Sequence, residues 1–84
     1  MIRLIYFSSV RDSIGADGED VDPPVHVVTA RDLVQFLGAR SHGHARAFAD
    51  VGRLRAAIDL EMVDLDTPIA GAREIAFFPP VTGG

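Results

Sequence analysis

The two most apolar strand-like segments of this chain lie at its two ends. Residues 2–7 are apolar except for Arg3, and residues 74–78 place four apolar residues after Glu74 before a proline ends the run. Short apolar runs of this kind suit strands in the middle of a sheet, covered on both faces. A chain of 84 residues forms one domain with one modest core. We therefore expect the two terminal strands to lie side by side at the centre of a sheet.

The best-marked helix of the sequence follows Thr29. The Thr29 hydroxyl can cap a helix N-terminus, and Asp32 at the third helical position completes a capping box. Apolar residues then recur at helical spacing, and Gly38 is a natural end point. The residues of this apolar stripe are Ala30, Leu33, Phe36 and Leu37. We expect the helix to pack across one face of the sheet through this stripe.

Weaker patterns fill the rest of the chain. We expect one or two helical turns over residues 8–14, ended by Gly15, and an edge or interrupted strand over residues 19–27, where two prolines break the ladder. We also expect a short helix over residues 45–50, with Phe48 turned inward and Gly52 as the break after it. Two strands follow, over residues 54–58 and 61–63. The order predicts an α+β fold with a mixed sheet and one main helix on one face. It matches the β-grasp roll of ubiquitin-like proteins.

Residues 79–84 are predicted to form a tail beyond a folded domain of residues 1–78. Pro79 and Pro80 hold the chain extended, and the residues after them carry little bulk. Terminal glycines have no side chain to bury, so they contribute nothing to packing. A flexible, slim tail can instead carry its terminal carboxylate into the active site of another protein, where that carboxylate reacts. The residues expected to insert are Pro80, Val81, Thr82, Gly83 and Gly84, with Gly84 as the reacting residue. The alternative is an ordinary frayed terminus.

Composition excludes several classes of function. The net charge of -4 argues against nucleic acid as a partner, because phosphate binding needs concentrated basic residues. No apolar run approaches the ~20 residues of a membrane span, and the N-terminal segment lacks a charged leader, so we expect a cytoplasmic protein that binds no membrane. The chain has no Cys, so no side chain can carry a thiolate or a persulfide. It also has no Lys, since all eight basic residues are Arg.

Other side chains give weaker signals. Phe77 and Phe78 are neighbours in a strand and point to opposite faces, so one enters the core, and the other either docks a partner or is covered by neighbouring segments. The three histidines, His26, His42 and His44, lack the spacing of metal ligands, so no metal is expected. Four carboxylates that lie close together in the sequence fit a solvated face. They are Asp59, Glu61, Asp64 and Asp66. No phosphate-binding loop or nucleophile motif is present, so we expect no independent enzyme.

Both ends of the sequence resemble one known family. The closing residues from Glu74 to Gly84 are similar to the closing motif of the small subunit of molybdopterin synthase, a ubiquitin-like sulfur carrier. The start over residues 2–7, followed by Val10-Arg11, and the total length are similar as well. Asp59 stands where that family commonly has Asn, and residues 71–73 replace a common Asp-Gly-Asp turn, so local turns differ.

The resemblance implies a mechanism in which the catalytic residues belong to partners. An adenylating enzyme would use ATP to convert the Gly84 carboxylate into an acyl adenylate, and a sulfur donor would replace AMP and leave a thiocarboxylate. The large synthase subunit, in a heterotetramer with two copies of each subunit, would accept the tail and transfer the sulfur to cyclic pyranopterin monophosphate, a precursor of the molybdenum cofactor. The chain would hold no permanent cofactor, only a transient AMP ester and then sulfur on Gly84.

Three alternatives stay open at the level of sequence. A related carrier would supply sulfur for thiamine, cysteine or tRNA thiolation. A ubiquitin-like modifier would join Gly84 to a lysine of a target protein through an isopeptide bond. A non-covalent docking module would use the tail only as an anchor and would tolerate an added residue after Gly84.

Overall fold

A computed structural model describes residues 1–80 of the chain. The elements follow one another as β1 (Ile2–Tyr6), α1 (Ser8–Ile14), β2 (Gly18–Val21), α2 (Ala30–Gly38), α3 (His42–Ala47), the 3-10 helix η1 (Val51–Arg53), β3 (Arg55–Ile58), β4 (Glu61–Val63) and β5 (Glu74–Phe78). Residues 81–84, which include most of the predicted tail, lie outside the described residues.

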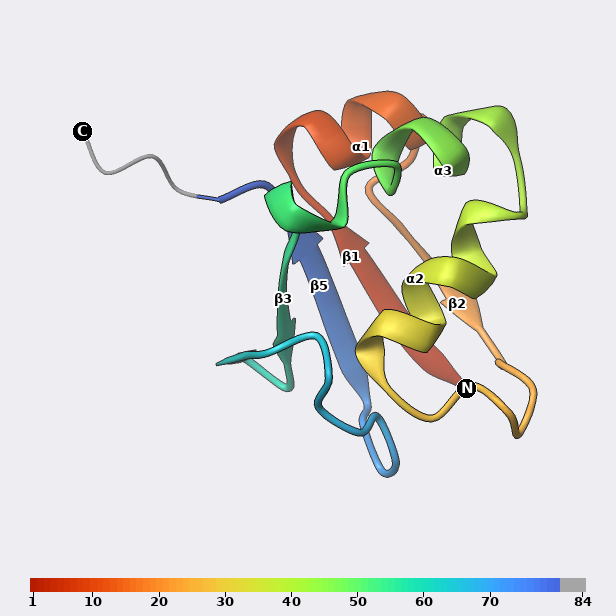
Figure 1. Ribbon diagram of the computed structural model, residues 1–84, viewed down its shortest axis with the longest axis vertical. Coiled ribbons are helices and arrows are strands. Elements are labelled where there is room, and N and C mark those ends of the chain that lie inside the picture. The colour runs from red at the N-terminus through yellow and green to blue at the C-terminus, as the bar shows by residue number, and fades with distance from the viewer. Residues whose placement is uncertain (81–84) are drawn as a thin grey trace.

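One mixed sheet organises the fold, with the strand order β2-β1-β5-β3-β4. The first and last strands, β1 and β5, pair in parallel, and their arrows point the same way in Figure 1. The other three pairs are antiparallel. The prediction that the terminal strands lie side by side at the sheet centre is confirmed, since β5 is the middle strand and β1 is its neighbour.

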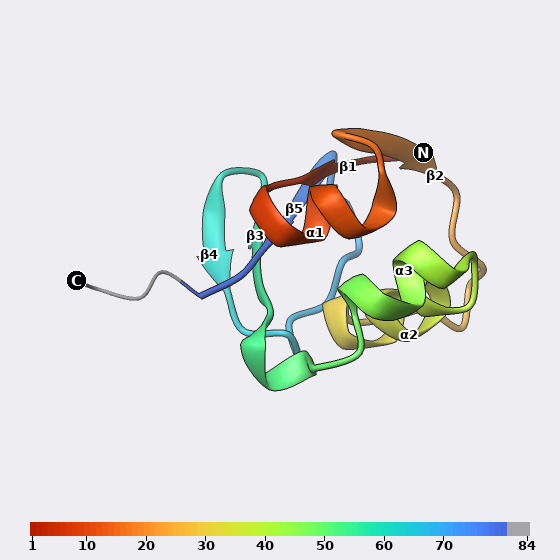
Figure 2. The ribbon, with the colours of Figure 1, turned by 90° about the horizontal axis from the view of Figure 1, so that it is seen from above.

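The helices α1, α2 and α3 lie on one side of this sheet, as Figure 2 shows. Leu4 and Tyr6 of β1 point to that side and are buried, whereas Arg3 is exposed and Ile5 is half-buried. The expectation that β1 is covered on both faces is therefore wrong. A chain of this length has enough helix to cover one face, so the apolar run of β1 places Ile5 on a face that the helices leave open.

The helix α2 forms as the sequence predicts. The Thr29 hydroxyl accepts a hydrogen bond from the Asp32 N–H at 3.1 Å, and the Asp32 carboxylate accepts the N–H groups of Thr29 and Val28, each at 3.1 Å. These backbone hydrogen bonds hold the pKa of Asp32 below its usual range. Of the predicted stripe, Ala30, Leu33 and Leu37 are fully buried, while Phe36 lies half-buried at the margin of the core.

The shorter elements differ from expectation at their ends. α1 ends as expected at Gly15, whose φ of 85° gives the left-handed cap that glycine favours. β2 is an edge strand, as expected, but it ends at Val21, so the part of the expected strand from residue 22 to residue 27 does not form. The second short helix, α3, starts three positions before the expected Ala45, because Ser41 caps it by accepting the His44 N–H at 3.1 Å. Phe48 is buried as predicted. Gly52 lies inside η1 and so does not interrupt helical structure there.

The turn between β3 and β4 has a left-handed backbone at both central residues. Asp59 has φ of 48° and Leu60 has φ of 73°, the pattern of a two-residue hairpin turn of type I′. The Asp59 carboxylate accepts the N–H groups of Arg73 and Glu74 at 3.0 and 2.9 Å. The hairpin is thereby tied to the start of β5, and the position where the resembled family commonly has Asn keeps a side chain that tolerates this backbone.

Candidate functional site: the open face and the start of the tail

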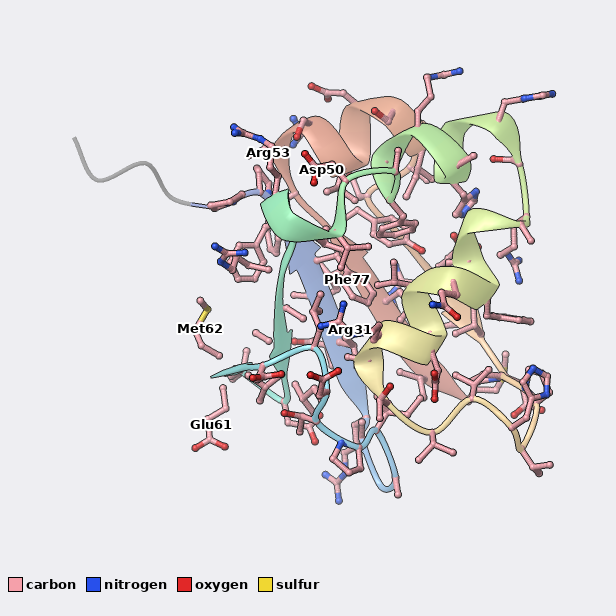
Figure 3. All side chains as sticks on the ribbon, in the orientation of Figure 1. Arg31, Asp50, Arg53, Glu61, Met62 and Phe77 are labelled. Carbon is pink, nitrogen blue, oxygen red and sulfur yellow. The ribbon has the colours of Figure 1, made fainter. Side chains whose placement is uncertain are left out.

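The two adjacent phenylalanines at the end of β5 have separate environments. Phe77 is fully buried between the sheet and the helices, with its ring centroid 5.4 Å from that of Phe48 (Figure 3). Phe78 is half-buried on the opposite face and meets the ring of Phe7 edge to face at 6.5 Å. The prediction that one ring enters the core and the other faces away is confirmed, and the outward ring is Phe78.

The predicted tail starts directly after the central strand. Pro79 and Pro80 follow Phe78 directly and are half-buried, and Figure 1 shows this end of β5 beside the start of α1. The Phe7 N–H donates to the Phe77 carbonyl at 3.2 Å, so the ladder between the first and last strands continues up to the point where the tail starts. The predicted inserting residues Val81, Thr82, Gly83 and the reacting Gly84 lie outside the described residues.

We call the sheet surface opposite the helices the open face. Strand alternation and pairing register bring six apolar side chains together there, which we call the apolar patch. The patch consists of Ile5, Phe7, Ala57, Met62, Ala76 and Phe78. Phe7 is 48% exposed and Met62 is 66% exposed, and Figure 3 shows Met62 at the β4 edge of the molecule. An exposed apolar surface of this kind, beside the residues where the predicted tail starts, can hold a partner protein.

A buried polar cluster that sequence reasoning missed lies at the β2 edge of the sheet. His44 is only 8% exposed, and its Nε2 lies 2.6 Å from a Glu19 carboxylate oxygen, while its Nδ1 lies 2.7 Å from the Ser41 hydroxyl. The Tyr6 hydroxyl donates to Glu19 at 2.8 Å, and Arg40 lies 3.2 Å from the other Glu19 oxygen. Ser41 three positions before His44 hinted at a cap, but nothing in the sequence linked His44 to a residue in β2.

The pKa values of two residues in this cluster, Glu19 and Tyr6, depart from their usual ranges. Partial burial alone would raise the pKa of Glu19, but the hydrogen bonds from His44 and Tyr6 and the nearby charge of Arg40 outweigh it and lower that pKa. Burial, together with the hydrogen bond to Glu19, raises the pKa of Tyr6 well above its usual range. The cluster links α3 to β2 through His44 and Glu19. Because β2 and β4 are opposite edges of the sheet, the cluster lies far from the Met62 side of the apolar patch.

The remaining candidates from the sequence do not come together. His26 and His42 are exposed and separate from the buried His44, and residues 1–80 contain no group of three or more histidines and carboxylates that could hold a metal. The four carboxylates of the predicted solvated face are exposed, as expected. Two of them take part in side-chain contacts near α2 and its neighbouring loop: Asp66 pairs with Arg31 at 2.8 Å, and Asp64 accepts the Asp66 N–H at 2.7 Å. Within the part of the chain that is described, no helix is long and apolar enough to cross a membrane.

Comparison with known proteins places the chain in a family. Residues 4–84 match the model of the ThiS family. The chain is 40% identical to the molybdopterin synthase sulfur carrier subunit of Escherichia coli (strain K12) and 32% identical to that of Haemophilus influenzae, in each case over 100% of both chains.

Solved structures show the same architecture. The structure of SAMP1 from Haloferax volcanii has a TM-score of 0.69 and 27% identity, and covers 99% of this chain and 98% of that chain. A Pyrococcus furiosus structure at 24% identity, with a TM-score of 0.73 over 95% of this chain and 97% of that chain, has the same fold. The predicted β-grasp fold is confirmed. The chain belongs to the ThiS family, and the Escherichia coli and Haemophilus influenzae relatives that it matches from end to end are named sulfur carrier subunits of molybdopterin synthase.

Proposed function

We propose that this chain is the sulfur carrier subunit of a molybdopterin synthase and that it has no catalytic activity alone. The observation that carries the proposal is the 40% identity, end to end, with the Escherichia coli protein of that name. The family match also extends to Gly84, the last residue. The buried Phe77 and the outward Phe78 support this function, because they fix the strand that carries the tail and leave an apolar patch beside its start.

The proposed chemistry takes place on the Gly84 carboxylate. An adenylating enzyme joins this carboxylate to AMP from ATP and releases pyrophosphate, which makes the carbonyl carbon electrophilic and gives it a good leaving group. A sulfur donor then displaces AMP, so the chain ends in a thiocarboxylate. The sulfur is nucleophilic near neutral pH, as a thiolate of low pKa is. It is the only sulfur position available for this chemistry, because the chain has no Cys.

The proposed receiving partner is the large synthase subunit, in a heterotetramer of two small and two large subunits. We place its docking surface on the open face, where the apolar patch adjoins Pro79 and Pro80. The tail enters its active site, and the sulfur passes to cyclic pyranopterin monophosphate. Two sulfurs are needed for each product, so two carriers are consumed.

The test is the mass of the C-terminal peptide after the pure protein is incubated with ATP, the adenylating enzyme and a sulfide source. We expect one oxygen on Gly84 to be replaced by sulfur. Fragment mapping is required, because oxidation of Met1 or Met62, which are 84% and 66% exposed, changes the mass by almost the same amount. A variant with one alanine added after Gly84 is the matched control and should gain no sulfur at Gly84. An unmodified Gly84 with an active partner enzyme would contradict the proposal.

The likeness to SAMP1 favours a second candidate, a ubiquitin-like modifier, because the same protein is described as small archaeal modifier protein 1. A modifier would form an isopeptide bond between Gly84 and a lysine of a target. This chain has no Lys, so copies of it could join one another only through the α-amine of Met1. A tagged chain that gives a ladder of larger bands in cell lysate, lost when Gly84 is deleted, would identify the modifier. A single free band would favour the carrier.

A further inference from the structure

Arg55 lies at the border of the apolar patch and has an unusual hydrogen-bond arrangement. In the register of β3 and β5 it is opposite Phe78, and its side chain is exposed. Its Nη1 donates to two backbone carbonyls, that of Gly52 at 3.2 Å and that of Leu54 at 2.9 Å. The two bonds hold one corner of the guanidinium against η1, so this long side chain loses little further conformational freedom when a partner binds.

The charge of Arg55 is not balanced within the described residues. Arg3, Arg11, Arg31 and Arg40 each lie within 3.5 Å of a carboxylate oxygen. Arg46, Arg53, Arg55 and Arg73 form no such pair in residues 1–80. Among these four, Arg55 is the one whose side chain is held by backbone carbonyls, and its Nε and Nη2 make no hydrogen bond in that part of the chain. These two nitrogens lie along one edge of the planar guanidinium, which can donate two parallel hydrogen bonds to one carboxylate.

A cleft of about 430 Å³ opens beside Arg55 at the edge of the sheet. Its apolar lining comes from Val51, Leu54, Val63 and Leu65, and its other charged residues are Arg31 and Asp64. Arg31 is already bound to Asp66 at 2.8 Å, and Figure 3 shows Arg31 between α2 and the opposite loop. Of the two arginines that line this cleft, Arg55 is therefore the one that forms no ion pair with a carboxylate among residues 1–80.

We propose that Arg55 receives a carboxylate side chain of the large synthase subunit, presented from an apolar surface that covers the patch. The inference rests on the proposed function and adds what that partner must carry: a Glu or Asp at the edge of its interface, opposite β3. The position follows from continuity, since Arg55 joins the patch at Phe78 to the cleft at η1. A bidentate ion pair at this border contributes specificity and affinity together.

The experiment compares binding of the large subunit to the full-length wild type and to three variants, at low and at high salt. Arg55→Leu should weaken binding about tenfold at low salt, and the difference should shrink at high salt. Arg55→Lys keeps the charge but not the two parallel donors, so its affinity for the large subunit should lie between those of the wild type and Arg55→Leu. Arg46→Leu removes an exposed arginine of α3, on the helix side of the sheet, and should change binding less than about twofold. Circular dichroism establishes that each variant is folded.

A second readout observes Arg55 directly. In ¹⁵N spectra of the arginine Nε–H groups, the Arg55 signal should shift when the large subunit binds, and the Arg46 signal should not. Wild-type affinity retained in folded Arg55→Leu overturns the inference and leaves the proposed function intact. Failure of the wild type to bind the large subunit overturns the docking part of the proposed function itself. An Arg55 signal that shifts with the concentration of the free protein would assign the site to a second copy of this chain and would also overturn the inference.

Discussion

Substitution of Phe77 should mainly lower the stability of the domain, whereas substitution of the adjacent Phe78 should mainly weaken binding to the large subunit. Phe77 is fully buried and touches the ring of Phe48, so Phe77→Ala should cost about 3–5 kcal/mol of unfolding free energy. Phe78 is half-buried and its ring meets the ring of Phe7, so Phe78→Ala should cost about 1 kcal/mol. A domain of this size has a total stability of roughly 4–13 kcal/mol, so the first loss is a large part of it.

Urea unfolding followed by circular dichroism measures both losses. With a slope of about 1 kcal/mol per molar urea, Phe77→Ala should lower the midpoint by about 3 M or more, and Phe78→Ala by about 1 M. Phe77→Leu gives a smaller loss in the same direction and remains measurable where Phe77→Ala no longer folds. Binding to the large subunit should show the reverse order, with Phe78→Ala weakened and Phe77→Leu close to wild type. Equal midpoints for Phe77→Ala and Phe78→Ala would refute the assignment of the two faces.

Four further substitutions test other parts of the structure. The pKa of Glu19 is lower in the folded state than its unfolded value of about 4.5. The stabilisation that ionised Glu19 gives is therefore present above that unfolded value and is lost as the pH falls through the folded value. The difference in unfolding free energy between wild type and Glu19→Gln, read from urea midpoints, should be larger at pH 6.5 than at pH 3. Thr29→Ala removes the cap of α2 and should lower the free energy of unfolding by about 1 kcal/mol, read from the urea midpoint. Gly43→Ala would place a Cβ against the Ser13 carbonyl oxygen of α1 and should lower the melting temperature; an unchanged melting temperature would contradict the close packing of α1 and α3. Leu60→Gly relieves a left-handed backbone at an exposed side chain and should raise that temperature slightly; a fall would contradict the assigned turn.

The sequence predicts helix ends correctly where the cause is a contact between residues close together in the chain. The capping box of Thr29 and Asp32 involves positions three apart, and the left-handed Gly15 caps the helix that directly precedes it. The pairing of the terminal strands was also predictable, because two strongly apolar strands compete best for the centre of a sheet.

Long-range contacts were not readable in the same way. The burial of His44 depends on Glu19, which is distant in the sequence and reaches it only after the sheet has formed. The open side of β1 was missed because a continuous apolar run does not reveal whether one face or both will be covered. Arg55 gave no signal, since an arginine in an alternating strand normally points to solvent. The tail residues Val81 to Gly84 remain a prediction from sequence and resemblance.

The parallel pairing of β1 with β5 also determines how the domain resists a mechanical load. A partner that grips the tail pulls on β5 from its C-terminal end, along the direction of the strand. Because β5 is bonded to β1 on one side and β3 on the other, this force shears two ladders at once and does not open them one bond at a time. The tail is therefore anchored to the strand that is hardest to extract.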